Sequence, residues 1–175
     1  MEYLQLSKVY VNNIHNKAGT QAMSIDGSGR PLILNGKVPC FHVYMSGNQT
    51  ITQATAATVV FNANDFLHGW SLASDGVLTC GSGAGGIYII NFRVRINSGS
   101  DGNWYARIQK NGNSLVGEYM QNEYYEYANV ATLAEIADAD TIKAIVYQNI
   151  GTISNTIGGN DLGPNCYMYA HRISG

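Results

Sequence analysis

Charged side chains are scarce in this chain of 175 residues. Asp, Glu, Lys and Arg together make up 13% of it, about half the share that soluble domains usually carry. The net charge is −2 and no run of Lys or Arg occurs, so the basic stripe that binds a phosphate backbone is missing. We expect no nucleic-acid partner. Asn, Ser, Thr, Gly and Gln must solvate the surface, a composition common in secreted and viral coat proteins.

Long apolar runs are also missing. No stretch approaches the roughly 20 residues that a membrane-spanning helix needs. The first residues, Met1 to Leu4, have neither the basic start nor the apolar core of a signal peptide. We therefore expect no membrane insertion, and a protein that folds in the cytosol where it is made.

Residues that build metal and catalytic sites are few and scattered. The cysteines Cys40, Cys80 and Cys166 lack a CxxC spacing and adjoin apolar or aromatic residues, which favours buried free thiols. The four histidines never stand two or four positions apart, and no GxSxG, P-loop or HExxH motif occurs. We expect no cofactor, no metal and no enzymatic activity.

Two features of the acidic residues leave alternatives open. Asp138 and Asp140 stand two apart in a predicted turn, where they either hold a cation weakly or accept backbone hydrogen bonds. The second is the commoner use of Asp in turns. A polysaccharide-degrading enzyme would need two carboxylates facing each other across a groove. The chain has 12 acidic residues but no pattern that singles out such a pair.

Short apolar runs separated by glycine clusters dominate the rest of the sequence. With 20 glycines and three prolines, this pattern predicts many short strands joined by turns, and no amphipathic helix. One face of residues 86–96 is wholly apolar and must point into a core. Its members are Tyr88, Ile90, Phe92, Val94 and Ile96. The other face begins with Ile87 and Ile89, so we expect another subunit to cover that end.

Three further segments predict strands with defined turns. Asn111-Gly112 is a hairpin signal, and the strand before it carries Trp104, which we expect in the core. Residues 130–144 predict a strand, a tight turn at Asp138 to Asp140, and a second strand. The last strand covers residues 166–173. About eight strands at regular spacing predict a jelly roll, with an up-and-down barrel and an immunoglobulin-like sandwich as alternatives.

Residues 1–37 differ from the rest of the chain. Alternating apolar pairs separated by Asn- and Gly-rich turns predict two or three small hairpin pieces. These have too little apolar area to fold alone. We therefore divide the chain into a leader, residues 1–37, and a main domain, residues 38–175. The leader needs a partner, either other copies of the chain or a larger particle.

A series of motifs between Phe41 and Ile173 resembles the C1q/tumour-necrosis-factor family. The matching segments, in order, are Phe41-His42-Val43-Tyr44, Asn48-Gln49-Thr50, Thr58-Val59-Val60-Phe61-Asn62, Asp75 to Cys80 with Gly85-Gly86-Ile87-Tyr88, Lys110-Asn111-Gly112, Leu133 with Asp140 and Ile142, and Tyr167 to Ile173. The resemblance implies an all-β jelly-roll sandwich that forms a homotrimer. The chain departs from the family pattern at three places: no Pro follows Cys80, Ala139 replaces a Gly, and Ala170 stands near the closing-strand Gly. No ligand site of the family carries over.

The leader resembles the start of phage tail-fibre and capsid-fibre proteins. The similarity lies in Val11 to Thr20 and Ser24 to Arg30, which match an "Asn-x-Ile-x-Asn…Gly-Thr…Ile…Gly-Arg" pattern. It implies that residues 1–37 anchor the chain to other virion proteins or build the trimer. The expected location is the surface of the virion.

Aromatic residues suggest a binding surface. Tyr119, Tyr124, Tyr125 and Tyr127 crowd one passage beside three glutamates, and there are 12 tyrosines in all. Exposed Tyr beside carboxylates suits a rim that binds carbohydrate or protein, whereas buried tyrosines would line the trimer axis. The predicted rim comprises Trp70, Tyr124, Tyr125 and Tyr127. The predicted trimer interface comprises Ile87, Ile89 and Tyr119.

These observations favour a trimeric bacteriophage structural protein, a fibre, knob or capsid decoration that presents a rim to a host surface glycan or protein. One alternative is a purely structural protein that stabilises capsid or tail without binding a receptor. A further alternative is a secreted C1q-like carbohydrate-binding module.

Overall fold

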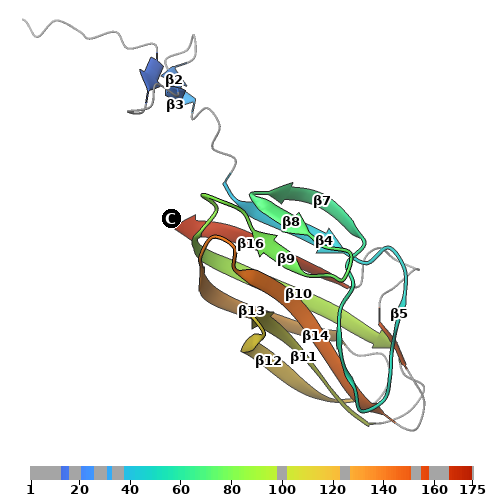
Figure 1. Ribbon diagram of the computed structural model, residues 1–175. Coiled ribbons are helices and arrows are strands. Elements are labelled where there is room, and N and C mark those ends of the chain that lie inside the picture. The colour runs from blue at the N-terminus through green and yellow to red at the C-terminus, as the bar shows by residue number, and fades with distance from the viewer. Residues whose placement is uncertain are drawn as a thin grey trace, which may run out of the picture. The chain divides into compact units, whose positions relative to one another are not determined.

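The computed structural model is all β and divides into two compact units, Met1–Lys37 and Val38–Gly175 (Figure 1). It describes residues 13–15, 21–25, 31–32, 38–97, 102–122, 127–150, 155–157 and 166–174. The first unit holds a three-stranded antiparallel sheet of β1 (Asn13–His15), β2 (Gln21–Ile25) and β3 (Pro31–Leu32).

The second unit consists of two antiparallel sheets packed face to face. Sheet 1 runs in the order β5 (Gln49–Ile51), β15 (Asn155–Ile157), β10 (Gly86–Asn97), β16 (Tyr167–Ser174), β4 (Cys40–Tyr44) and β7 (Ala63–His68), with β13 (Tyr127–Ile136) also paired to β10. Sheet 2 runs in the order β12 (Asn113–Asn122), β11 (Gly102–Lys110), β14 (Thr141–Ile150), β9 (Leu78–Cys80) and β8 (Trp70–Leu72), with β6 (Ala56–Thr58) also paired to β14. From β9 onward the chain crosses repeatedly between the sheets, as a jelly roll requires.

The predicted strand count holds for the longer strands. Among the described residues of the second unit, eight strands have five or more residues: β4, β7, β10, β11, β12, β13, β14 and β16. The remaining strands, β5, β6, β8, β9 and β15, have three residues each. A strand of three residues is too short to show an alternating pattern, which is why the sequence does not predict these pieces.

The core lies between the two sheets and follows the predicted alternation. Tyr88, Ile90, Phe92, Val94 and Ile96 of β10 are all 0% exposed, which confirms the predicted core face. On the facing sheet, the core side of β11 contributes Trp104, Ala106 and Ile108, also fully buried. The core is therefore built by period-two alternation on both sheets.

Both predicted turns are present. Asn111 and Gly112 adopt positive φ values of 49° and 82° and join β11 to β12 as a hairpin. The segment from Val130 to Ala144 forms the end of β13, a turn at Ala139 with φ of 67°, and the start of β14. The two strands around this second turn belong to different sheets, so the turn is a crossing point of the sandwich.

Trp70 lies in a different place from the predicted one. The sequence analysis places Trp70 in the exposed binding rim, but Trp70 stands in β8 and is 7% exposed. Its ring packs edge to face against Phe41 at 5.0 Å and Tyr88 at 5.4 Å between centroids. Gly69, with φ of 74°, turns the chain from sheet 1 into sheet 2 and so directs the indole into the core.

Candidate functional site

The outward face of sheet 1 carries large apolar side chains exposed to solvent. We call this surface the sheet-1 face; it consists of the outward-pointing residues of β13, β10, β16, β4 and β7. Ile87 and Ile89 are 42% and 44% exposed, and Leu133 is 63% exposed beside Ile89. Tyr169, Ile173 and Phe66 are also exposed on these strands. A contiguous apolar surface of this kind marks an interaction site rather than ordinary scatter.

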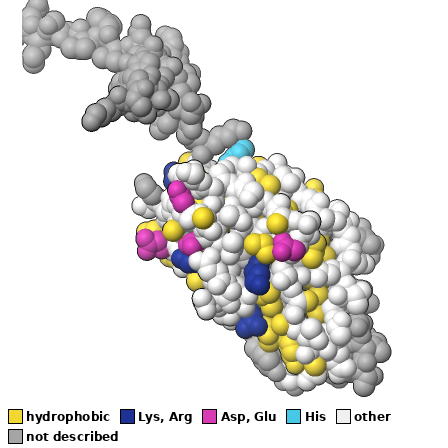
Figure 2. Space-filling view, viewed as in Figure 1, with side chains coloured by type: hydrophobic (Ala, Val, Ile, Leu, Met, Phe, Trp, Pro, Cys, Tyr) yellow, Lys and Arg dark blue, Asp and Glu magenta, His cyan; other side chains and the backbone are white. Residues whose placement is uncertain are grey.

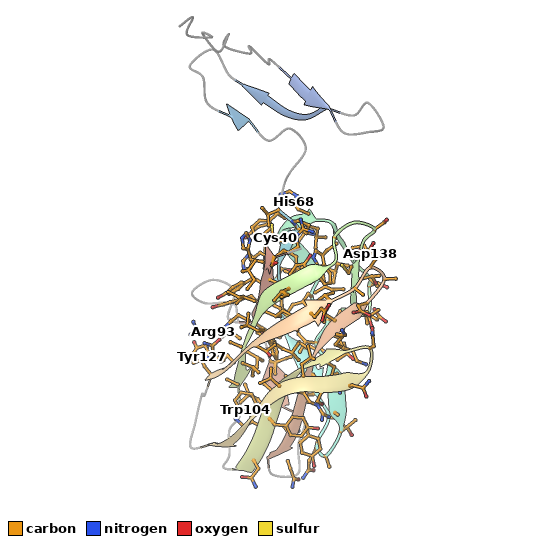
Figure 3. The ribbon with its side chains drawn as sticks, turned by 90° about the vertical axis from the view of Figure 1, so that its left-hand side faces the viewer. Cys40, His68, Arg93, Trp104, Tyr127 and Asp138 are labelled. Carbon is orange, nitrogen blue, oxygen red and sulfur yellow. The ribbon has the colours of Figure 1, made fainter. Side chains whose placement is uncertain are left out.

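Cross-strand register places three histidines on the same face. His171 pairs with Ile89 on one side and with Cys40 on the other, and Cys40 in turn pairs with His68. In the next row, Tyr169 pairs with His42. Figure 3 shows Cys40 and His68 at the same end of the sandwich. The histidines, scattered in sequence, are therefore gathered by the sheet, which sequence spacing could not reveal.

His42 is the histidine with an acidic partner. Its Nδ1 lies 2.6 Å from Oδ2 of Asp65, and its ring centroid is 5.7 Å from that of Tyr167. His68 instead stacks on Phe66, with centroids 5.8 Å apart and planes 17° apart. Within the part of the chain that the structure describes, neither His68 nor His171 forms an ion pair.

Basic and aromatic side chains meet at the end of the sheet-1 face that lies away from Ile87 and Ile89. The guanidinium carbon of Arg93 lies 4.3 Å from the ring centroid of Tyr127, and that of Arg95 lies 5.9 Å from it. Figure 3 shows Arg93 and Tyr127 side by side. Tyr127 is 39% exposed, as the predicted rim requires, but it belongs to the sheet-1 face because it pairs with Arg95 across the strands.

Other predicted rim and interface tyrosines are placed only in part. Tyr124 and Tyr125 lie outside the described residues. Tyr119 stands in β12, where its Cα pairs with that of Tyr105, and its side chain also lies outside the description. The predicted rim of Trp70, Tyr124, Tyr125 and Tyr127 is therefore not assembled as one surface by the described residues.

The outward face of sheet 2 carries an aromatic pair that the sequence analysis missed. Tyr105 and Tyr147 are cross-strand partners whose rings stack, with centroids 5.0 Å apart and planes 7° apart. The guanidinium of Arg107 lies 4.7 Å from the Tyr105 ring, and its Nη2 donates a hydrogen bond to the Tyr105 hydroxyl at 2.8 Å. We call these three residues the sheet-2 patch. The pairing joins positions 42 apart in sequence, so sequence spacing could not reveal it.

The surface around these groups is poor in charge. On the face drawn in Figure 2, Lys, Arg, Asp and Glu side chains are few, and hydrophobic side chains lie among them. This agrees with the 13% content of charged residues and leaves aromatic and apolar groups as the principal surface features.

Asp138 and Asp140 bind the backbone of neighbouring turns. Asp138 accepts hydrogen bonds from the amides of Gly83 at 2.8 Å and Gly85 at 2.9 Å, and these amides lower its pKa. Asp140 accepts from the side chain of Asn111 at 2.7 Å and from the amide of Ala137 at 2.8 Å. These bonds, with Lys110 at 3.0 Å, lower the pKa of Asp140 to about 2. Both carboxylates thus act in turn structure.

The cysteines carry no disulfide and no recognisable metal site. All three are free thiols; Cys80 and Cys166 are buried and Cys40 is half-buried. Burial raises the pKa of Cys166 and of Cys80. Across the described residues, no group of three or more His, Cys, Asp or Glu side chains is arranged to hold a metal ion. The same part of the chain contains no helix long and apolar enough to cross a membrane.

Comparison with known proteins identifies the fold. No protein-family model matches the sequence, and no curated protein is significantly similar to it. Among solved structures, the crystal structure of murine APRIL at pH 5.0 is similar, with a TM-score of 0.56 and 14% sequence identity over 78% of this chain and 100% of that chain. At this identity the likeness concerns the fold. Since APRIL is a TNF-family jelly roll, residues 38–175 have the TNF/C1q-like β-sandwich fold that the motif series predicts.

Proposed function

We propose that the chain is a homotrimeric structural protein of a bacteriophage virion, in which residues 38–175 form a knob and residues 1–37 attach it to other virion proteins. The observation that carries the trimer is the apolar sheet-1 face. Ile87, Ile89 and Leu133 stand exposed on neighbouring strands of one sheet face. A TNF-like fold supports self-association as the means of covering such a face.

The energetics favour a covered face. Fully burying one Ile or Leu side chain contributes about 1.5–3 kcal/mol, so side chains that are already half-buried contribute about half of that each. Association costs translational and rotational freedom. The free energy of burying these residues outweighs that cost only when several of them on each of the three copies are buried together. Ile87 and Ile89, predicted from the sequence as interface residues, are part of this set.

The virion location is supported by the leader. Its resemblance to the start of phage fibre proteins is confined to short motifs, but the leader also forms a compact unit of its own with a small antiparallel sheet. A short three-stranded sheet has little apolar area to bury and gains stability from a partner surface. Three leaders on one trimer would attach with avidity, because the second and third contacts are intramolecular.

The trimer proposal is tested by sedimentation velocity of the full chain and two variants. Replacing Ile89 and Leu133 together by Asp places charge in the sheet-1 face and is expected to give a folded monomer. The matched control is Leu115→Asp on β12, which is 37% exposed outside that face and is expected to leave the trimer intact. A trimer that survives the double change contradicts the proposed interface.

Host-surface binding is a second candidate function, and the sheet-2 patch favours it. In a trimer built through the sheet-1 face, Tyr127 would be covered together with Arg93 and Arg95, whereas Tyr105, Tyr147 and Arg107 would remain on the outside. Stacked aromatic rings beside a hydrogen-bond donor suit a sugar ring or a protein side chain. Three patches on one trimer would convert a weak contact into a durable one.

The two roles differ in what the isolated protein does. If it binds the host, micromolar trimer competes with phage for cells, and Tyr147→Ala reduces that competition at least tenfold while Thr79→Ala, elsewhere on sheet 2, does not. If its role is purely structural, no competition occurs and particles that lack the protein lose stability. Release of reducing sugars from host polysaccharide would contradict the proposal that the chain is not an enzyme.

A further inference from the structure

We propose that acid weakens self-association through the sheet-1 face, and that His68 and His171 are the residues that sense it. The inference rests on the proposed trimer and adds its regulation. It predicts an assembly that is tight in neutral and alkaline solution and loosens below about pH 6, where imidazole side chains gain a proton.

The two histidines lie among the apolar residues of the face. His171 is the direct cross-strand partner of Ile89, which is itself the partner of Leu133. His68 occupies the same row, beyond Cys40. A surface that covers Ile89 and Leu133 in another copy therefore reaches His171 and extends toward His68. Burial in such a surface favours the neutral imidazole over the charged one.

Among the described residues, neither histidine forms an ion pair with an acidic side chain. His68 stacks on the ring of Phe66, and His171 stands between Ile89 and Cys40. In the described residues, the ion pairs that involve side chains are those of His42 with Asp65 and of Lys110 with Asp140. His42 differs from the other two because its Nδ1 lies within hydrogen-bond distance of Oδ2 of Asp65, at 2.6 Å.

The other charged groups of the face carry both signs, and among the described residues none of them forms an ion pair with His68 or His171. Arg93 and Arg95 of β10 add positive charge, and Asp65 of β7 is bonded to His42. Glu135 of β13 pairs in register with Ile87. Arg172 of β16 donates from Nη1 to the carbonyl oxygens of Gly85 at 3.1 Å and Gly83 at 3.4 Å. Protonation of His68 and His171 therefore adds positive charge to a face that already holds two arginines.

The size of the effect follows from linkage. In general, an interface that buries an imidazole in its neutral form loses about tenfold in the association constant for each pH unit below the imidazole pKa. Two such residues in each copy give an acid dependence steep enough to separate trimer from monomer at micromolar protein.

Sedimentation velocity of the full chain at pH 8.0 and pH 5.5, over a range of micromolar concentrations, tests the inference. We expect trimer at pH 8.0 and a shift of at least tenfold in the dissociation constant at pH 5.5. Fluorescence of the buried Trp70 and Trp104 should be the same at both pH values, which distinguishes dissociation from unfolding. The double variant His68→Gln/His171→Gln is expected to remain trimeric at both.

His42→Gln is the matched control, because it removes a histidine from the same face without touching the two sensors. It is expected to dissociate in acid as the natural chain does. Equal trimer stability of the natural chain at both pH values overturns the inference but leaves the trimer proposal standing. Monomer at both pH values overturns the trimer proposal itself. Acid dissociation that persists in the double variant overturns the assignment to His68 and His171.

Discussion

Single residues show how side chains hold the crossing points of this sandwich. Asp140 lies in the turn between sheets and binds Asn111 of the β11–β12 hairpin, 29 positions away, as well as the amide of Ala137. The sequence predicts that this Asp accepts local backbone hydrogen bonds, and the Ala137 contact confirms it. The Asn111 partner is not predictable, because the jelly-roll topology alone brings the two turns together.

Asp140→Asn tests the contribution of its charge. The pKa of Asp140 is lowered to about 2 in the folded chain, below the ordinary value, so its stabilisation is complete above pH 4. The contribution is lost as the pH falls through that range toward 2. We expect the variant to lower the free energy of unfolding by about 0.5–1 kcal/mol at pH 7, since the group is partly solvated, and by clearly less at pH 2, where Asp140 is about half protonated. Urea denaturation at both pH values measures this; an equal difference at both would contradict it.

Trp70→Ala distinguishes a core residue from a rim residue. Because the indole packs against Phe41 and Tyr88 inside the sandwich, we expect the free energy of unfolding to fall by about 3–5 kcal/mol. An exposed tryptophan would cost under about 0.5 kcal/mol. Chemical denaturation of the purified variant decides between these values, and a small loss would contradict the burial of Trp70.

Whole elements were predictable where alternation is long. β10 and β11 show uninterrupted period-two patterns, and their core faces are buried as predicted. Strands of three residues are too short to be predicted from alternation. One of them, β8, places Trp70 in the core. The sheet-1 face was predicted only at Ile87 and Ile89. The strands that carry Leu133, His171 and His68 are far apart in sequence. Only the pairing of these strands in the structure places the three residues on the sheet-1 face.

Two glycines in turns allow a matched test of local geometry. Gly76 and Gly112 have similar positive φ values of 85° and 82°. A Cβ at Gly76 would lie 2.1 Å from the carbonyl oxygen of Val59, whereas nothing lies within 4 Å of a Cβ at Gly112. Gly112→Ala should lower the free energy of unfolding by about 1 kcal/mol, through backbone strain alone.

Gly76→Ala should lower the free energy of unfolding clearly more than Gly112→Ala does. The new Cβ would meet the backbone of Val59, next to β6, so that segment or the β8–β9 turn must also move. Thermal denaturation of both variants measures the difference. Equal melting temperatures would contradict the close approach of residue 76 to Val59.

At the scale of the whole molecule, a TNF/C1q-like sandwich is combined with a small separate N-terminal unit. The fold was predictable because alternating apolar segments and turn signals recur along residues 41–173 of the sequence. The surfaces were less predictable, because the residues that lie together on a surface depend on which strands become neighbours. An apolar face on one sheet and an aromatic patch on the other give the two sheets different proposed roles, one in assembly and one in contact with other surfaces.

Light scattering of the full chain at pH 8 tests the central claim most directly. The account predicts a solution mass of three times 18.9 kDa, or 56.7 kDa, at micromolar protein. A mass of 18.9 kDa that does not rise with concentration would contradict the trimer, and with it the covered sheet-1 face and the avidity of the proposed virion attachment.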